Sequence, residues 1–245
     1  MAEAQAPTPI VLNVGITGHR AGALTAPMLR KLQPIVNGVF RQLREAALSL
    51  QQSEDALCSV TKPRLLLHTG MASGADQIAA KGARSSGYLV RAVLPFEPEE
   101  YRKDFAAGEE LRHFDKALAD ADEVHALPGD RSDLNAAYVG VGQWVVGTAD
   151  VLVAIWDGEK ARGPGGTAHV VEMAREASIP VIHIEVDRSS GEVRMRALMD
   201  GDDPAPPMAS LDPDLYTRVL RGAFKLGHVG DEEKALAAAE EAAAG

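Results

Sequence analysis

Three short segments combine glycine with residues that can bind an anion: GITGHR (15–20), TGMASGAD (69–76) and GPGGTA (163–168). Glycine lets a ligand approach the backbone, because there is no β-carbon in the way. Arg20 can place a forked guanidinium on phosphate oxygens. Thr167 can either cap a helix or donate its hydroxyl to a phosphate. This chemistry suits a phosphorylated small molecule.

The elements that must position these segments alternate along the chain. Short apolar runs that predict strands lie at 10–17, 64–68, 88–95, 123–128, 150–157 and 179–186. Patterns that predict helices lie between them, at 25–52, 74–87, 97–121, 133–149 and 167–178. Such alternation predicts an α/β fold, a Rossmann-like, doubly wound and mainly parallel sheet. Ligands of such sheets bind at the carboxyl ends of the strands, near the point where the strand order reverses.

All three glycine segments follow a predicted strand, so they meet at one edge of a parallel sheet. The second and third run directly into a helix, whose free N–H groups and dipole favour an anion. The predicted ligand-binding residues are Thr17, Gly18, His19, Arg20, Gly70, Ser73, Gly74, Asp76, Asp157, Gly165, Gly166 and Thr167.

Several of these residues also have purely structural interpretations. Asp76 opens a helix and can serve as its N-cap. His19 can be an ordinary loop histidine, and His68 a satisfied strand residue. Tyr138 and Trp144 stand near helical spacing, which favours a place in the core.

The chain divides into three parts. Residues 1–9 are predicted to be a disordered lead, and residues 10–187 a nucleotide-binding domain. Residues 188–245 form a Pro/Asp-rich linker followed by an acidic C-terminal extension, poorly structured or helical. The segment LYTRVLRGAF within it has the pattern of a helix.

Composition restricts the partners. The net charge is −10, of which −4 belongs to the last fifteen residues, leaving −6 for the rest. A duplex-binding surface needs a concentrated basic stripe, so duplex nucleic acid is not expected as a partner. No apolar stretch reaches membrane-spanning length, no leader pattern opens the chain, and one cysteine, Cys58, suits a reducing compartment. A cytoplasmic protein without membrane contact is expected.

Common cofactor motifs do not occur. GITGHR carries two glycines, not the three of the dinucleotide fingerprint, and no lysine follows a glycine loop as in a P-loop. Cysteine and histidine do not recur at metal-ligand spacing. We therefore expect a nucleotide-type ligand, with no metal and no required cofactor.

The motifs resemble a known group. TGMASGAD resembles the glycine loop of the DNA-processing protein A family, and GPGGT with a following helical glutamate resembles the PGG-x-GT-x-x-E motif of the LOG phosphoribohydrolases. Together with GITGHR and VLVAIWDG they are similar to the SLOG superfamily over roughly residues 10–187. The resemblance implies a Rossmann-like fold that binds nucleotides or signals such as ADP-ribose or NAD derivatives.

One departure bears on catalysis. The LOG enzymes carry glutamates two and three residues after the threonine, where this chain has His169 and Val170. The first acid here is Glu172, roughly 140° around the helix from Thr167.

The interpretation favoured by these observations is a binding module or sensor, acting through an effector partner or a homo-oligomer. One alternative is an N-glycosidase that acts on nucleoside monophosphates, with Glu172 or Asp157 stabilising the positive charge at the ribose. The other is a single-stranded DNA binder.

Overall fold

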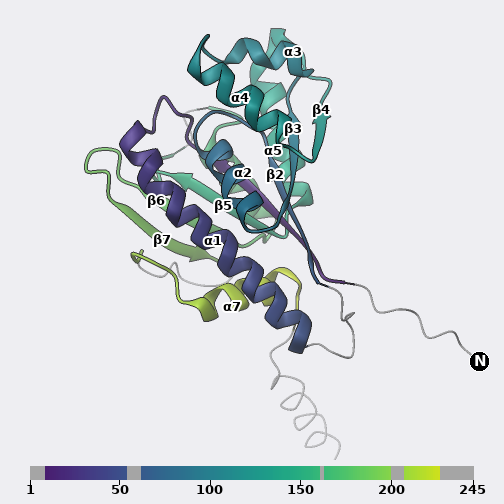
Figure 1. Cartoon of the computed structure of the whole chain (residues 1–245), viewed down its shortest axis with the longest axis vertical. Helices are drawn as coiled ribbons and strands as arrows, with labels where there is room; N and C mark the ends of the chain where they lie inside the picture. Colours follow the sequence, from purple (N-terminus) through teal and green to yellow (C-terminus); the bar gives the residue numbers. More distant parts are fainter. Residues whose placement is uncertain (1–8, 54–61, 161–162, 200–206, 227–245) are drawn as a thin grey trace, which may run out of the picture.

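A seven-stranded sheet forms the centre of the molecule, in the order β4-β3-β2-β1-β5-β6-β7 (Figure 1). The computed structural model describes residues 9–53, 62–160, 163–199 and 207–226. The strands are β1 (Val11–Gly18), β2 (Arg64–Thr69), β3 (Leu89–Leu94), β4 (Glu123–Ala126), β5 (Val151–Trp156), β6 (Val181–Val186) and β7 (Val193–Leu198). The helices are α1 (Ala26–Ser53), α2 (Ala75–Ser85), α3 (Pro98–Tyr101), α4 (Glu109–Ala119), α5 (Leu134–Thr148), α6 (Thr167–Glu176) and α7 (Pro213–Ala223), with 3-10 turns η1 (Arg102–Asp104) and η2 (Arg131–Asp133).

The strand order reverses at β1. Strands β2 to β4 add outward on one side of β1, and the chain then crosses back so that β5 pairs with the other side of β1. All neighbouring strands are parallel except β6 and β7. The carboxyl ends of β1 and β5 are therefore the topological switch point of a doubly wound sheet. The predicted Rossmann-like α/β fold is confirmed.

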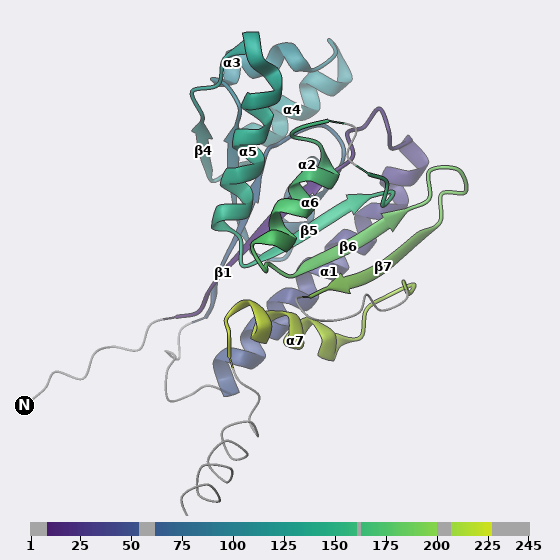
Figure 2. The ribbon, with the colours of Figure 1, turned by 180° about the vertical axis from the view of Figure 1, so that it is seen from behind.

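Helices cover both faces of the sheet. Helices α1, α2 and α7 lie on one face, whereas α5 and α6 lie on the other (Figures 1 and 2). Because both sides are covered, a central strand such as β5 is buried along its whole length, which explains its unbroken apolar run, VLVAIW.

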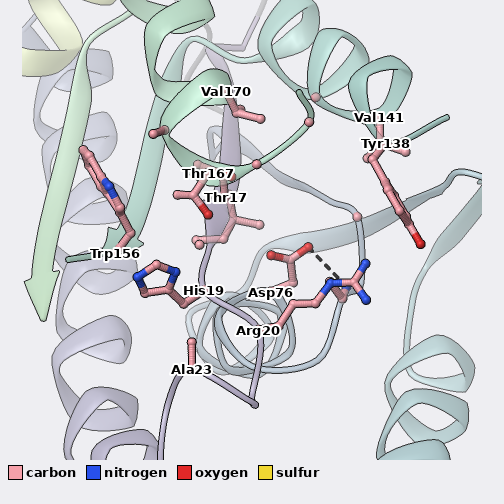
Figure 3. Close-up of a pocket in the computed structure, with 18 of the residues that line it drawn as sticks. Thr17, His19, Arg20, Ala23, Asp76, Tyr138, Val141, Trp156, Thr167 and Val170 are labelled. Atoms are coloured by element: carbon pink, nitrogen blue, oxygen red, sulfur yellow. Dashed lines mark hydrogen bonds between the residues drawn. The ribbon is translucent and has the colours of Figure 1, made fainter. Parts of the chain in front are cut away.

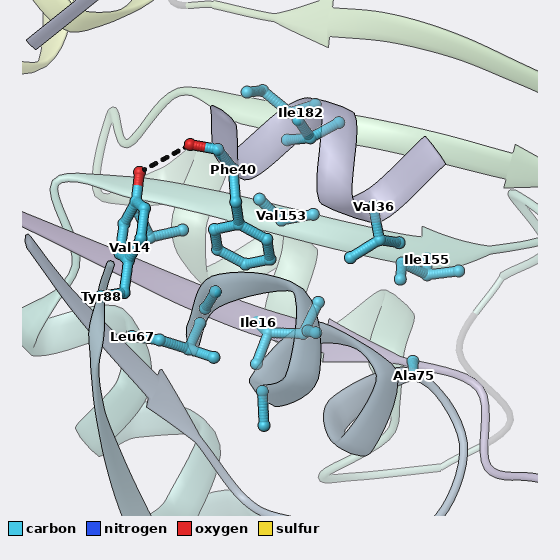
Figure 4. Close-up of a cluster of buried hydrophobic side chains, with 14 of the residues drawn as sticks. Val14, Ile16, Val36, Phe40, Leu67, Ala75, Tyr88, Val153, Ile155 and Ile182 are labelled. Atoms are coloured by element: carbon cyan, nitrogen blue, oxygen red, sulfur yellow. Dashed lines mark hydrogen bonds between the residues drawn. The ribbon is translucent and has the colours of Figure 1, made fainter. Parts of the chain in front are cut away.

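The larger part of the core lies between the sheet and α1 and α2 (Figure 4). Helix α1 buries one stripe, including Val36 and Phe40, against Ile16 and Val153 of the sheet. Tyr88 also enters this layer, and its hydroxyl donates to the carbonyl oxygen of Phe40 at 3.2 Å. Few aromatics are needed, because aliphatic side chains fill the space.

Two features differ from the sequence expectations. The helix predicted at 97–121 is broken into α3, η1 and α4, with Gly108 in the left-handed region at φ +101° before α4. The sheet continues past residue 187, where β7 pairs antiparallel with β6. The helical pattern of LYTRVLRGAF is confirmed by α7 (Pro213–Ala223), which packs beside α1. The predicted lead, apart from residue 9, and the acidic end of the tail lie outside the described residues.

None of the described helices has the length and apolarity needed to cross a bilayer.

Candidate ligand-binding site

A cavity of about 500 Å³ opens at the switch point, between the carboxyl ends of β1 and β5. The three glycine loops and helix α5 form its walls (Figure 3). The predicted residues that line it are Thr17, Gly18, His19, Arg20, Gly70, Asp76, Asp157, Gly165, Gly166 and Thr167. The structure thus brings together residues that stand up to 150 positions apart in the sequence, from Thr17 to Thr167.

Ser73 and Gly74 lie behind this wall. Ser73 is buried, and its carbonyl accepts a hydrogen bond from the N–H of Ala21 at 3.1 Å. Gly74 has φ +95°, and a β-carbon there would stand 2.6 Å from the carbonyl oxygen of His19. Only glycine allows this close approach. These two residues therefore fix the β1–α1 loop, which carries Arg20, and do not line the cavity themselves.

The third loop turns the backbone toward the cavity. Gly165 has φ +76°, and its N–H donates to Nδ1 of His169 at 3.0 Å. Gly166, at φ −76°, is the N-cap residue of α6 and makes no side-chain cap. Thr167 is the first helical residue, and nothing in the described part of the chain hydrogen-bonds its hydroxyl. The cap interpretation of Thr167 is therefore wrong, and both the hydroxyl and the helix N-terminus face the cavity.

Arg20 stands at the mouth of the cavity. Its guanidinium carbon lies 5.2 Å from the centroid of the Tyr138 ring. Within the described residues no carboxylate forms an ion pair with it, although Asp104 and Asp76 lie close enough to feel its charge. Stacking on the Tyr138 ring and a hydrogen bond with its hydroxyl hold the guanidinium in place, and the remaining N–H groups are available to an anion.

Asp76 lies in the first turn of α2, and the N-cap residue of that helix is Gly74. Its side chain folds back over the β2–α2 loop, where Oδ2 accepts hydrogen bonds from Thr69 Oγ1 and the N–H of Ala72, each at 3.3 Å. Burial raises the pKa of Asp76 to about 6, against the lowering effect of these hydrogen bonds and of Arg20. The loop contains Met71 at φ +56°, a rare conformation for a buried side chain that these contacts hold.

A second polar group lines the other end of the cavity. Asp157 Oδ2 lies 3.1 Å from His19 Nε2 and 3.1 Å from Arg188 Nη1. Burial would raise the pKa of Asp157, but the N–H of Glu159 and the neighbouring His19 and Arg188 outweigh it and hold the pKa below its ordinary value. Asp157 therefore stays ionised at neutral pH.

Sequence reasoning missed several residues that line the cavity. Tyr138 was expected in the core, yet it is half-buried on the cavity wall, where Asp104 accepts a hydrogen bond from its hydroxyl. Tyr101, Trp156 and Arg188 also line the cavity. Gly142, which lets α5 pack closely against α6, was the available signal for Tyr138, because the same helix passes the cavity.

His68 is a buried strand residue whose Nε2 lies 3.1 Å from Asn13 Oδ1, and burial lowers its pKa to about 4. Its Nδ1 has no hydrogen-bond partner among the described residues, so the histidine is only partly satisfied. Trp144 was expected in the core but is half-buried, and it packs against His68 and His125. Glu172 is exposed and does not line the cavity, as its place on the helix predicted. Among the described residues no cluster of histidine, cysteine and acidic side chains has the arrangement of a metal site.

No family model and no curated protein matches the sequence at a significant level. Among solved structures, the chain is similar to DNA processing protein A from Streptococcus pneumoniae, with a TM-score of 0.47 and 18% identity over 75% of this chain and 53% of that one. It is similar to the structural-genomics protein TM1055, with a TM-score of 0.40 and 19% identity over 69% and 72% of the two chains. It is also similar to the molybdenum cofactor carrier protein of Chlamydomonas reinhardtii, with a TM-score of 0.38 and 19% identity over 70% and 76%. The matched part spans about half the length of DNA processing protein A. The fold assignment itself rests on the strand order and the switch point.

Proposed function

We propose that this protein is a binding module or sensor for a phosphorylated nucleoside ligand, such as a nucleotide, ADP-ribose or an NAD-derived signal. One observation carries the proposal. The N-terminus of α6, with the uncommitted hydroxyl of Thr167, opens into the same cavity as Arg20, which has no ion-pair partner among the described residues.

The α6 terminus and Arg20 together make an anion seat. Unpaired N–H groups of the first helical turn and the helix dipole favour negative charge. Gly166 leaves space above the backbone, since a β-carbon there would meet nothing closer than the carbonyl oxygen of Gly163 at 3.5 Å. A phosphate can therefore lie directly on the backbone, and Arg20 adds a positive charge to the same cavity.

The cavity is larger than a phosphate needs. Its volume of about 500 Å³ lies within the range of about 300–1,000 Å³ typical of small-molecule sites. Tyr138 and Trp156 supply aromatic surface to its walls, and His183 stacks behind Trp156 with ring centroids 4.0 Å apart. Anion seat and aromatic walls together favour a phosphorylated nucleoside over inorganic phosphate.

The experiment is a thermal-shift screen with nucleotides, NAD, ADP-ribose and cyclic ADP-ribose isomers, followed by calorimetry. A ligand at a hundredfold excess over its Kd should stabilise the fold by about 2.7 kcal/mol. Arg20→Ala should weaken binding by about 1.5–3 kcal/mol, the range for hydrogen bonds to charged groups. Arg41→Ala is the matched control, because Arg41 is exposed on α1, away from the cavity. No melting shift and no heat with any phosphorylated nucleoside would refute the proposal.

A second candidate is N-glycosidic hydrolysis of a nucleoside monophosphate. Asp157 favours it, because an ionised carboxylate in the cavity can stabilise a positive charge at the ribose. The exposed Glu172 counts against it, and we expect base release to be absent or very slow. Chromatography for free base after incubation with each monophosphate tests this. Turnover near one per second, abolished by Asp157→Asn, would make the protein an enzyme.

A further inference from the structure

The wall of the cavity contains one buried carboxylate that the anion seat does not explain. Asp76 is 6% exposed and lies between Thr17 and Arg20 in Figure 3. Thr69 Oγ1 and the N–H of Ala72 donate to Oδ2, and the N–H of Gly70 also lies close enough to stabilise the ionised carboxylate. No side chain of the described residues donates to Oδ1, and a carboxylate has about four lone-pair sites, so Asp76 retains acceptor capacity for a group in the cavity.

The other cavity aspartate differs in this respect. Asp157 Oδ1 accepts a hydrogen bond from the N–H of Glu159 at 3.2 Å. Its Oδ2 is engaged by Arg188 and lies beside His19. Both oxygens of Asp157 are committed to the protein, so of these two aspartates Asp76 is the one with acceptor capacity for a ligand.

A carboxylate accepts hydrogen bonds and repels anions, so the group that meets Asp76 must be a donor. Arg20 lies beside Asp76, which places this donor next to the phosphate seat. In a phosphorylated nucleoside the donors covalently nearest to the phosphate are the hydroxyls of the sugar, whereas the base donors lie farther away. The neighbourhood of Asp76 thus matches a ribose and not a base.

We propose that Asp76 is a specificity-determining residue that accepts a hydrogen bond from a ribose hydroxyl of the ligand. The cavity then selects ribonucleotides over deoxyribonucleotides. This inference rests on the proposed function, because it takes the phosphate seat at Arg20 and α6 as its reference point. A site built to hydrogen-bond a hydroxyl rejects the analogue that lacks it, because the polar group of the protein is left unpaired.

The test compares binding of 5′-AMP, 2′-deoxy-AMP and 3′-deoxy-AMP by calorimetry, together with base-free ribose 5-phosphate and 2-deoxyribose 5-phosphate. The wild-type protein should bind the ribose forms about ten- to a hundredfold more tightly than the form that lacks the contacted hydroxyl. Asp76→Asn keeps an oxygen for Thr69 and Ala72 but turns an amide N–H₂ toward the ligand. It should reduce the discrimination to within about threefold. Asp214→Asn, at an exposed position of α7 that does not line the cavity, is the matched control and should keep the ratio of the wild type.

Two results would overturn the inference. One is equal affinity of the wild type for ribose and both deoxyribose forms, a comparison that needs no variant. The other is an Asp76→Asn variant that weakens all probes by the same factor, which would make Asp76 structural. If deoxyribose forms bind as well as ribose forms and Arg20→Ala weakens both, only this inference fails. If no phosphorylated probe binds, the proposed function fails with it.

Discussion

At the scale of single residues, Thr167 separates a ligand site from an ordinary turn. The N-cap of α6 is Gly166, and no described group hydrogen-bonds the Thr167 hydroxyl. Thr167→Val keeps the shape and removes the hydroxyl. We expect it to weaken binding of a phosphorylated ligand by about 1.5–3 kcal/mol and to leave the Tm of the free protein nearly unchanged. Calorimetry and a melting curve on this one variant measure both quantities. A lower Tm with unchanged affinity would return this loop to a structural role.

The two neighbouring glycines should respond differently to substitution. Gly165 has φ +76°, and a β-carbon there would lie 3.0 Å from Cβ of Tyr138. Gly165→Ala should therefore destabilise the free protein by about 1–2 kcal/mol, the cost of the left-handed region for an L-residue. Gly166 has φ −76° and open space above it. Gly166→Val should abolish ligand binding by bulk while the unfolding midpoint in denaturant stays close to that of the wild type. Equal destabilisation by both changes would contradict this assignment.

Asp76 should leave a signature in the pH dependence of stability. Burial raises its pKa from 3.8 to about 6, so the folded state favours the protonated form. The protonated carboxyl therefore adds to the free energy of unfolding. This contribution is full below pH 3.8 and is lost as the pH rises through 6, which lowers the free energy of unfolding by about 3 kcal/mol. His68 and His183, whose pKa values burial lowers to about 4, act in the opposite direction over the same range.

The comparison with Asp76→Asn isolates this contribution, because the histidines are present in both proteins. Between pH 4 and pH 7, we expect the free energy of unfolding of the variant to rise by about 3 kcal/mol relative to that of the wild type. Urea unfolding at a series of pH values measures the difference. A constant difference across this range would show that Asp76 titrates normally.

At the scale of elements, helix α7 completes the layer that covers one face of the sheet. Val219 and Leu220 of α7 are buried, and the helix lies beside α1. Leu220→Ala should destabilise the protein by about 2–5 kcal/mol, the usual cost of truncating a fully buried leucine. Asp214→Ala, at an exposed position of the same helix, should cost about 0.5 kcal/mol through the helix dipole. Similar small losses from both would mean that α7 contributes little to the core.

The sequence predicts the parallel strands well, because each is an apolar run between turn residues. It did not predict β7, although VRMRAL alternates and buries Met195 and Ala197. An edge strand with one exposed face carries arginines on that face. These charged residues, next to a Pro/Asp-rich segment, made the alternating pattern of a strand hard to recognise. The break at Gly108 was also missed, because helical spacing continues on both sides of it.

The loops of the candidate site could be predicted for the same reason as the strands. A parallel sheet brings all its strand–helix loops to one edge, so Thr17, Arg20 and Thr167 had to be near one another. Tyr138 could not be placed in this way. It reaches the cavity from the middle of a helix, and only the packing of α5 against the sheet decides which way it faces.

At the scale of the whole molecule, charge argues against binding of single-stranded DNA. The chain carries a net charge of −10, and the cations that line the cavity are Arg20, Lys160 and Arg188. Arg188 is already paired with Asp157. Three cations can neutralise at most about three phosphates, so the logarithm of affinity should fall with the logarithm of salt concentration with a slope no steeper than about −2.

Fluorescence anisotropy of a labelled oligo-dT, titrated at several salt concentrations, measures this slope. We expect weak binding at about 150 mM salt, with Kd above about 100 μM. A tight complex with a slope of about −4 or steeper would require a basic surface other than the cavity, and strand binding would then replace nucleotide sensing as the better hypothesis.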